Sequence, residues 1–109
     1  MSNKGKYLLI ASMDVDTAKE ALFNEVYDQE HVPNLSRVPG VLSVSRYEVR
    51  ELTLRIGGEE KVVRFENEPK HHAFYEIESP DVLVSDEWAK ATELGRWQEQ
   101  VRPYTKNRR

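Results

Sequence analysis

The chain has 109 residues, of which 32% are charged and 39% hydrophobic, and its formal net charge at pH 7 is −3. This length suits one domain over residues 1–109 with a single core, and the acidic balance argues against nucleic-acid binding. The absence of cysteine excludes disulfides, thiolate catalysis and cysteine-ligated metal sites. No apolar run approaches the length of a membrane span, and residues 1–6 lack a signal-peptide core, so we expect a cytoplasmic protein without a membrane partner.

The N-terminal third predicts a strand followed by a helix. Residues 7–13 are apolar on both alternating faces, which is typical of a strand covered on both sides. An amphipathic helix is expected from about Asp16 to His31. Because Pro33 disfavours the helical region for the residue before it, the helix should end near His31.

The middle of the chain predicts strands and a hairpin. After the turn at Pro39-Gly40, residues 41–49 form a second strand, with Leu42, Val44 and Arg46 on one side and Val41, Ser43, Ser45 and Tyr47 on the other. Gly57-Gly58 marks the turn of a charged, exposed hairpin near residues 52–65.

The last third predicts one more strand and one more helix. Residues 71–77 form a strand, Ser85 caps a helix, and Gly95 breaks that helix. The basic residues near the C-terminus are expected to be a solvated tail. The resulting order fits an α+β protein whose antiparallel sheet carries helices on one face. The other face would expose aliphatic side chains, so we expect a homodimer that packs the two open faces together and encloses a pocket.

A polar cluster at the predicted helix end is the most informative feature. Tyr27 and His31 are four residues apart and should meet on one edge of the helix. Glu30 projects into the apolar arc formed by Ala18, Leu22, Phe23 and Val26. These polar groups are either satisfied structurally or line a pocket.

Several segments together carry a family resemblance. They are Tyr7–Met13, the motif Phe23-Asn24-Glu25-x-Tyr27-Asp28-x-Glu30-His31-x-Pro33, Val38-Pro39-Gly40-Val41, Arg46-Tyr47, Tyr75-Glu76-Ile77-Glu78-Ser79-Pro80, and Trp97 with Arg102-Pro103. This pattern resembles the EthD-like branch of the dimeric α+β barrel superfamily. The resemblance implies a ferredoxin-like βαββαβ protomer and a homodimer whose sheets form a barrel.

What the resemblance implies about activity is broader. The wider superfamily includes metal-independent monooxygenases, polyketide cyclases, lactone isomerases and haem enzymes, and many members of this branch have no assigned activity, so the fold does not fix function. Two features depart from the pattern. The hairpin around Gly57-Gly58 is longer than the usual connection, and the closing strand after Arg102 is either short or supplied differently.

His31 and Tyr27 are the candidate catalytic residues. His31 titrates near neutral pH and could move a proton to or from an enolisable carbon, while Tyr27 could orient the substrate oxygen. The structural alternative is a helix-end histidine on backbone carbonyls with Tyr27 packed beside it. Glu30 either orients His31 or pairs with Arg46, and the pairing is the preferred interpretation.

Further pocket candidates lie on two predicted strands. His72 and Glu76 share one face of strand 71–77, whereas Tyr75 lies on the other, and alternation does not decide which face meets the pocket. Arg46 and Tyr47 are the polar candidates on the neighbouring strand. His71 and His72 are adjacent on a strand and should point to opposite faces, so they cannot share one metal ion, and no haem motif is present.

The first hypothesis is therefore a small dimeric enzyme that moves protons on a hydrophobic, carbonyl-containing metabolite as an isomerase, cyclase or lyase, without metal or cofactor. Its catalytic residues would be His31 and Tyr27, and Glu30, Arg46, Tyr47, His72, Tyr75 and Glu76 would bind substrate. A non-catalytic protein that binds a small ligand or assists a degradation pathway is the second hypothesis. A cofactor-independent monooxygenase is the third.

Overall fold

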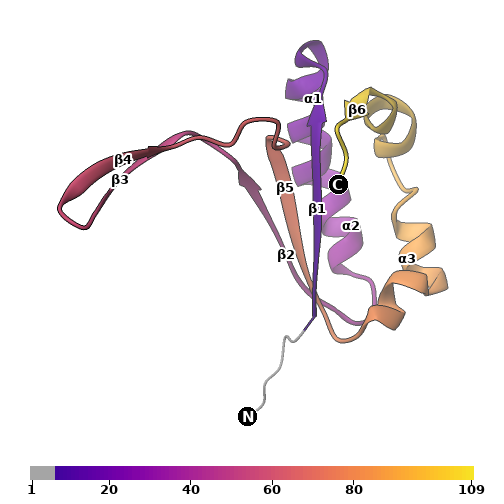
Figure 1. Ribbon diagram of the computed structural model, residues 1–109. Coiled ribbons are helices and arrows are strands. Elements are labelled where there is room, and N and C mark those ends of the chain that lie inside the picture. The colour runs from indigo at the N-terminus through magenta and orange to yellow at the C-terminus, as the bar shows by residue number, and fades with distance from the viewer. Residues whose placement is uncertain (1–6) are drawn as a thin grey trace.

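The computed structural model describes residues 7–109 and shows an α+β protein with one four-stranded sheet and a separate two-stranded hairpin (Figure 1). The elements in chain order are β1 (Tyr7–Val15), η1 (Thr17–Lys19), α1 (Glu20–Val26), η2 (Tyr27–His31), α2 (Val32–Ser36), β2 (Val41–Glu48), β3 (Leu52–Ile56), β4 (Glu59–Val63), β5 (His71–Ile77), η3 (Pro80–Val84), α3 (Asp86–Ala91), η4 (Trp97–Val101), η5 (Arg102–Tyr104) and β6 (Thr105–Lys106). The expected α+β class, with its antiparallel sheet and extra hairpin, is confirmed.

The main sheet has the order β2-β5-β1-β6, and its three pairings are antiparallel. The helices lie on one side of this sheet (Figure 1). Strand β5 pairs with both β1 and β2, and its odd-numbered residues, among them Ala73, Tyr75 and Ile77, are buried. Side chains alternate along a strand, so the even-numbered residues of β5 point to the uncovered face.

A register shift in β2 changes the predicted faces of its first residues. Val41 pairs with Ile77, whereas Ser43 pairs with Glu76, so β2 spends two residues where β5 spends one. This bulge keeps Val41 on the helix side and leaves Leu42 exposed at 55%. The prediction that grouped Leu42 with Val44 and placed Val41 opposite them was wrong because simple alternation does not survive a bulge.

The first helical region does not end near His31 as predicted. Residues Tyr27–His31 form a π-helical turn, in which the Val32 N–H donates to the Tyr27 carbonyl, and α2 continues to Ser36. Pro33 occupies the first turn of α2, where a helix needs no N–H from it. Because of this wide turn, the helical region continues through Pro33 into α2.

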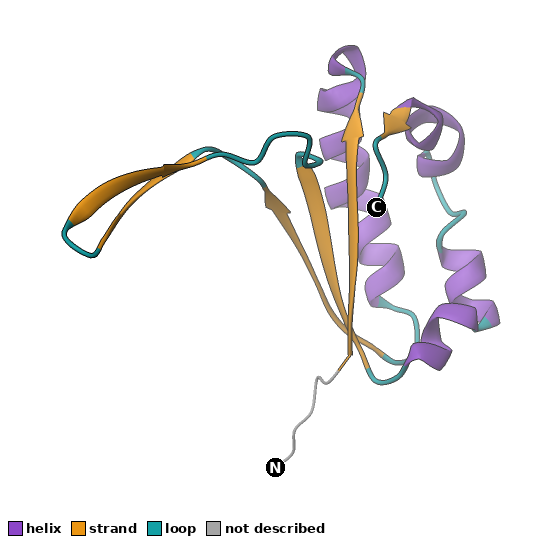
Figure 2. Ribbon diagram, in the orientation of Figure 1, coloured by secondary structure: helices purple, strands orange, loops and turns teal. Residues whose placement is uncertain are grey.

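The hairpin stands away from the sheet and helices as an arm of strands β3 and β4 (Figure 2). Its turn, Gly57-Gly58, has two positive φ angles of 62° and 80°, which suits glycine, so the predicted turn is confirmed. Every residue of the arm from Leu52 to Val62 is exposed. The arm helps to raise the radius of gyration to 16.1 Å, against about 13 Å for a compact chain of this length.

The C-terminal third closes the sheet. The hydroxyl of Ser85 accepts a hydrogen bond from the Trp88 N–H at 3.2 Å, so the predicted helix cap is confirmed. Helix α3 ends before Gly95, and the chain returns along β1 through the two-residue strand β6. The closing strand is therefore short and comes from the same chain.

Gly40 offers a test of the packing between the β2 turn and η3. It has φ of 93°, and a Cβ atom at this position would collide with the side chain of Val82. We expect Gly40→Ala to lower the free energy of unfolding by roughly 2–4 kcal/mol, from backbone strain plus overpacking. Gly57→Ala is the control, since it has positive φ but no atom near its Cβ position, and should cost about 1 kcal/mol. Equal losses in urea unfolding would contradict the packing argument.

Candidate functional site

The helix-side face of the sheet borders a cavity of about 140 Å³. Strands β1 and β5 form one wall of the cavity. The helical regions η2, α2, α3, η4 and η5 form the others. The lining residues are Leu9, Ala11, Met13, Tyr27, His31, Leu35, Tyr75, Trp88, Thr92, Trp97, Arg102 and Arg108. Three of the predicted site residues, Tyr27, His31 and Tyr75, therefore meet in one cavity.

The π-helical turn places Tyr27 and His31 on the buried side of the helix. Their rings are 5.1 Å apart at 85°, so the predicted contact between them is confirmed. The imidazole of His31 also stacks on Trp97, with 4.4 Å between centroids and 20° between planes. These contacts hold His31 at 5% exposure.

Burial keeps the His31 imidazole neutral. Desolvation is the largest cause of a pKa lowered from the ordinary 6.5 to about 4; the positive charge of Arg102 adds to it, Glu93 opposes it, and Arg108 contributes a smaller lowering. The Nδ1 atom is buried without a hydrogen-bond partner in the part of the chain that the structure describes. The His31 side chain nevertheless lines the cavity.

Tyr27 and Tyr75 form a hydroxyl pair beside His31. Their oxygens are 2.8 Å apart, and burial raises the pKa of both phenols, so both are protonated at neutral pH. The bond between them uses one of the two hydroxyl hydrogens. The other is free to donate to an oxygen in the cavity.

Two arginines at the cavity were not predicted as site residues. Arg102 binds Glu93 through distances of 3.0 and 2.6 Å and also donates to the Thr92 carbonyl at 3.1 Å. Arg108 donates to the Thr105 hydroxyl at 2.9 Å. No local pattern singles out Arg108 in the basic tail, and only the pairing of the C-terminal segment with β1 brings it to the cavity.

Glu30 is a structural residue of the helix packing. Its carboxylate accepts from the Arg96 backbone N–H at 2.9 Å and from Arg96 Nε at 2.6 Å, and these bonds lower its pKa. Neither of the predicted partners, His31 and Arg46, binds it. Glu30 does not line the cavity, and its assignment as a substrate-binding residue stays a prediction.

Arg46 lies on the helix side but outside the cavity. Its guanidinium donates to Asp28 at 2.7 Å, to Asn24 at 2.9 Å and to His71 Nδ1 at 3.2 Å, and lies 4.8 Å from the Tyr27 ring centroid. His71 Nε2 then donates to Glu20 at 2.8 Å. Arg46 thus packs on the Tyr27 ring through a cation–π contact without bordering the cavity itself.

The other predicted pocket residues lie on the uncovered face of the sheet. His72 accepts from the Ser12 hydroxyl at 2.8 Å and donates through Nε2 to the Pro69 carbonyl at 3.0 Å. Glu76 accepts from Ser43, and Tyr47 packs on Phe74 with 5.1 Å between ring centroids. None of His72, Glu76 and Tyr47 borders the cavity of His31. The sheet separates His72 and Glu76 from Tyr27, His31 and Tyr75, whereas Tyr47 lines a hollow of about 500 Å³ beside the edge strand β2 together with Arg46.

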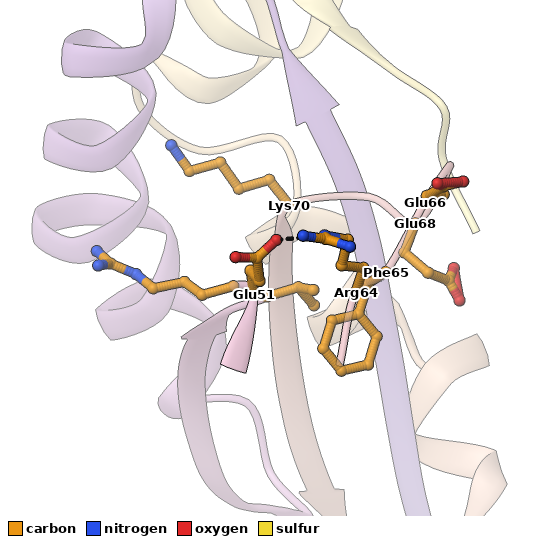
Figure 3. Close-up of a pocket in the computed structure, with 8 residues that line it drawn as sticks. Glu51, Arg64, Phe65, Glu66, Glu68 and Lys70 are labelled. Carbon is orange, nitrogen blue, oxygen red and sulfur yellow. Dashed lines mark hydrogen bonds and ion pairs between the residues drawn. The ribbon is translucent and has the colours of Figure 1, made fainter. Parts of the chain in front are cut away.

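A second hollow, of about 390 Å³, lies where the arm leaves the sheet (Figure 3). Glu51 and Arg64 form an ion pair of 2.6 Å there, and Phe65 offers an apolar ring. Lys70 is paired with Glu20 at 2.8 Å. This hollow contains none of the predicted site residues. It is lined by side chains of both charges, and Glu51 and Arg64 neutralise each other in an ion pair.

Residues 7–109 contain no group of three or more histidine or acidic side chains placed to hold a metal ion. His71 and His72 do point to opposite faces, as their different partners show. Within the same residues, no helix combines the length and the apolar character needed to cross a membrane. No protein-family model, curated protein or solved structure matches the chain.

The lowered pKa of His31 predicts acid sensitivity. Between about pH 6.5 and 4 the unfolded chain binds a proton that folded His31 does not, so stability falls as the pH falls. The shift from 6.5 to about 4 corresponds to about 3 kcal/mol. Urea unfolding between pH 7 and pH 4 should show this extra loss in the native chain relative to His31→Gln. Identical pH slopes would show that His31 is not held neutral.

Proposed function

We propose that the chain is a homodimeric enzyme that catalyses proton transfer on a small carbonyl compound held in the cavity beside His31. The observation that carries the proposal is the convergence of a neutral, buried imidazole and a spare phenol hydrogen on one partly open cavity. General acid–base catalysis needs these two groups within reach of one substrate. The π-helical turn η2 carries Tyr27 and His31, and strand β5 carries Tyr75. Helical segments η4 and α3 pack Trp97 against His31 and Trp88 against Tyr75, so these rings are held from several sides.

The residues suggest a simple division of work. The hydroxyl pair Tyr27–Tyr75 donates to the substrate carbonyl oxygen, which favours charge on that oxygen. Nε2 of His31 takes the proton from the adjacent carbon, the electron pair of the broken C–H bond forms the enolate, and the proton returns to another carbon in an isomerase. The developing negative charge also offsets the positive charges of Arg102 and Arg108, which otherwise oppose protonation of His31.

The fold supports an assignment to the EthD-like branch of the dimeric α+β barrel superfamily as part of the proposal. With the β3–β4 arm set aside as an insertion, the elements follow a ferredoxin-like βαββαβ order, and the sheet order β2-β5-β1-β6 agrees with it. The helix-end residues of the resemblance, Tyr27 and His31, are those that meet in the cavity.

The uncovered surfaces support a homodimer. Large apolar side chains are exposed on the open sheet face and along the arm. They are Leu8, Ile10, Leu42 and Tyr47 on the sheet, Leu52, Leu54, Ile56 and Val62 on the arm, and Phe65 directly after it. These nine side chains are between 38% and 58% exposed, and association that covers them removes their apolar surface from water.

The charge of the arm favours a protein partner of the same kind. Residues 50–66 carry four basic and four acidic side chains, so the arm has no net charge to attract nucleic acid or an anionic membrane. A hairpin alone is also marginally stable in water, and cover from a second copy would stabilise it. In this arrangement the pocket of each subunit remains on its helix side, not between the two sheets as first expected.

A non-catalytic role in binding a small ligand is the second candidate. It is favoured by the stacking of His31 on Trp97 at 4.4 Å, because such packing explains a buried imidazole without any reaction. Both candidates share the cavity, and only turnover separates them.

Proton exchange tests the catalytic proposal directly. A thermal-shift screen of aromatic, lactone and polyketide-like carbonyl compounds identifies ligands, and NMR in D₂O then follows deuterium entry next to their carbonyl groups. We expect His31→Gln to reduce the exchange rate at least 100-fold. Tyr27→Phe should reduce it about tenfold, since the Tyr75 hydroxyl remains to donate.

Tyr104→Phe is the matched control for the tyrosine change, because Tyr104 lies outside the cavity under Lys19. It should leave the rate unchanged. Ligands that bind the native chain but never exchange a proton would favour the non-catalytic candidate. Undiminished exchange in folded His31→Gln would remove His31 from catalysis.

Sedimentation velocity tests the dimer. The native chain should sediment at micromolar concentration as a particle of two 12.7 kDa chains. Placing a charge on the open face with Ile10→Glu should weaken association at least 100-fold, because the carboxylate would be buried without a partner. Val84→Glu is the control, since Val84 is 83% exposed on η3, away from the open sheet face and the arm. A native chain that remains a single subunit would contradict the proposal.

A further inference from the structure

Arg108 lines the cavity, and the proposed reaction gives it no direct contact with the substrate. The C-terminal segment is tied along β1 by backbone bonds between Ser12 and Arg109 at 3.1 and 2.9 Å and from the Asp16 N–H to Tyr104 at 3.0 Å. These bonds hold Arg108 at the cavity, whose lining it shares with Tyr27 and His31. Arg108, near the C-terminus, is therefore held at the cavity by backbone hydrogen bonds of its neighbours.

The charge of Arg108 is not neutralised by a carboxylate in the described residues. Its recorded hydrogen bond is the 2.9 Å contact of Nη1 with the Thr105 hydroxyl, which leaves donors on the guanidinium free. Arg102, the other arginine of the cavity, is held by two bonds to Glu93. The cavity therefore carries the positive charge of one exposed, unpaired guanidinium.

The other lining residues indicate the size and polarity of a ligand that the cavity could hold. Leu9, Ala11 and Met13 form an apolar floor, and Trp88 adds an aromatic ring. A volume of about 140 Å³ is close to that of cavities of roughly 150 Å³ that hold one benzene ring. Besides Arg108, the polar side chains at the cavity are His31, the hydroxyl pair, Thr92 and Arg102. Arg102 is bonded to Glu93, and the Thr92 hydroxyl to the Ala89 carbonyl.

We propose that the cavity binds a small carboxylic acid with one ring or a short chain, and that Arg108 holds its carboxylate. This inference rests on the proposed function for the opposite, carbonyl-bearing end of the molecule. Guanidinium groups pair well with carboxylates because two N–H donors match two oxygens. Arg108 is then a specificity residue that selects acids over neutral compounds of the same shape.

Binding of an acid has a consequence for His31. The charged groups that lower or raise its pKa are Arg102, Arg108 and Glu93, and Tyr27 and Trp97 face it as uncharged rings. A substrate carboxylate on Arg108 offsets one of the two positive charges. The imidazole then accepts a proton more readily when an acid is bound than when the cavity is empty.

Calorimetric binding of two probes tests the proposal with the full chain. Benzoate and benzamide have the same shape and differ in charge, and we expect the native chain to bind benzoate at least tenfold more tightly. Arg108→Gln should abolish this preference while leaving the affinity for benzamide unchanged, and Arg108→Lys should restore part of it. Arg109→Gln is the matched control, because Arg109 pairs with Glu68 at 3.1 Å and does not line the cavity.

Each outcome decides the proposal. Equal binding of the two probes, no binding of either at millimolar concentration, or a preference that survives Arg108→Gln would overturn it. Because the measurement is of binding, a chain that selects benzoate through Arg108 but exchanges no carbon-bound proton would keep this site while the proposed enzymatic function fails. Exchange on neutral carbonyl compounds without selection for acids would give the reverse result.

Discussion

Strand β5 sets the organisation of the molecule, because it lies inside the sheet and pairs with both β1 and β2. Successive side chains of a strand point to opposite faces, so Tyr75 meets the helices while His72 and Glu76 cannot. The strand side of the cavity around His31 follows from this alternation. Tyr75 supplies the hydroxyl partner of Tyr27, and the neighbouring odd-numbered residues of β1 supply the apolar floor of the cavity.

The π-helical turn is the second constraint on the site. A buried nitrogen without a hydrogen bond costs about 1–3 kcal/mol, and His31 Nδ1 is such a group. Stacking on Trp97 and edge contact with Tyr27 offset this cost. π-helical turns recur at functional sites in proteins, which agrees with a role for this one beyond packing.

The uncovered sheet face and the arm both expose apolar surface to water. Both expose aliphatic or aromatic side chains, and the arm has no layer packed on either of its faces. A second copy that covers both surfaces together would remove this apolar area from water without enclosing the cavity of either subunit. Association and chemistry are thus assigned to opposite sides of the sheet, and the two proposals can fail independently.

Local patterns determined the strand at 71–77, the Gly57-Gly58 turn, the Ser85 cap and the contact of Tyr27 with His31, because each depends on residues close in the chain. Tertiary structure decided the rest. The bulge in β2 reversed the expected faces of its first residues, since it depends on pairing with β5. Glu30 met Arg96 across 66 positions of sequence, and β6 brought Arg108 to the cavity. No local pattern encodes such long-range partners, because folding selects them by packing the whole chain at once.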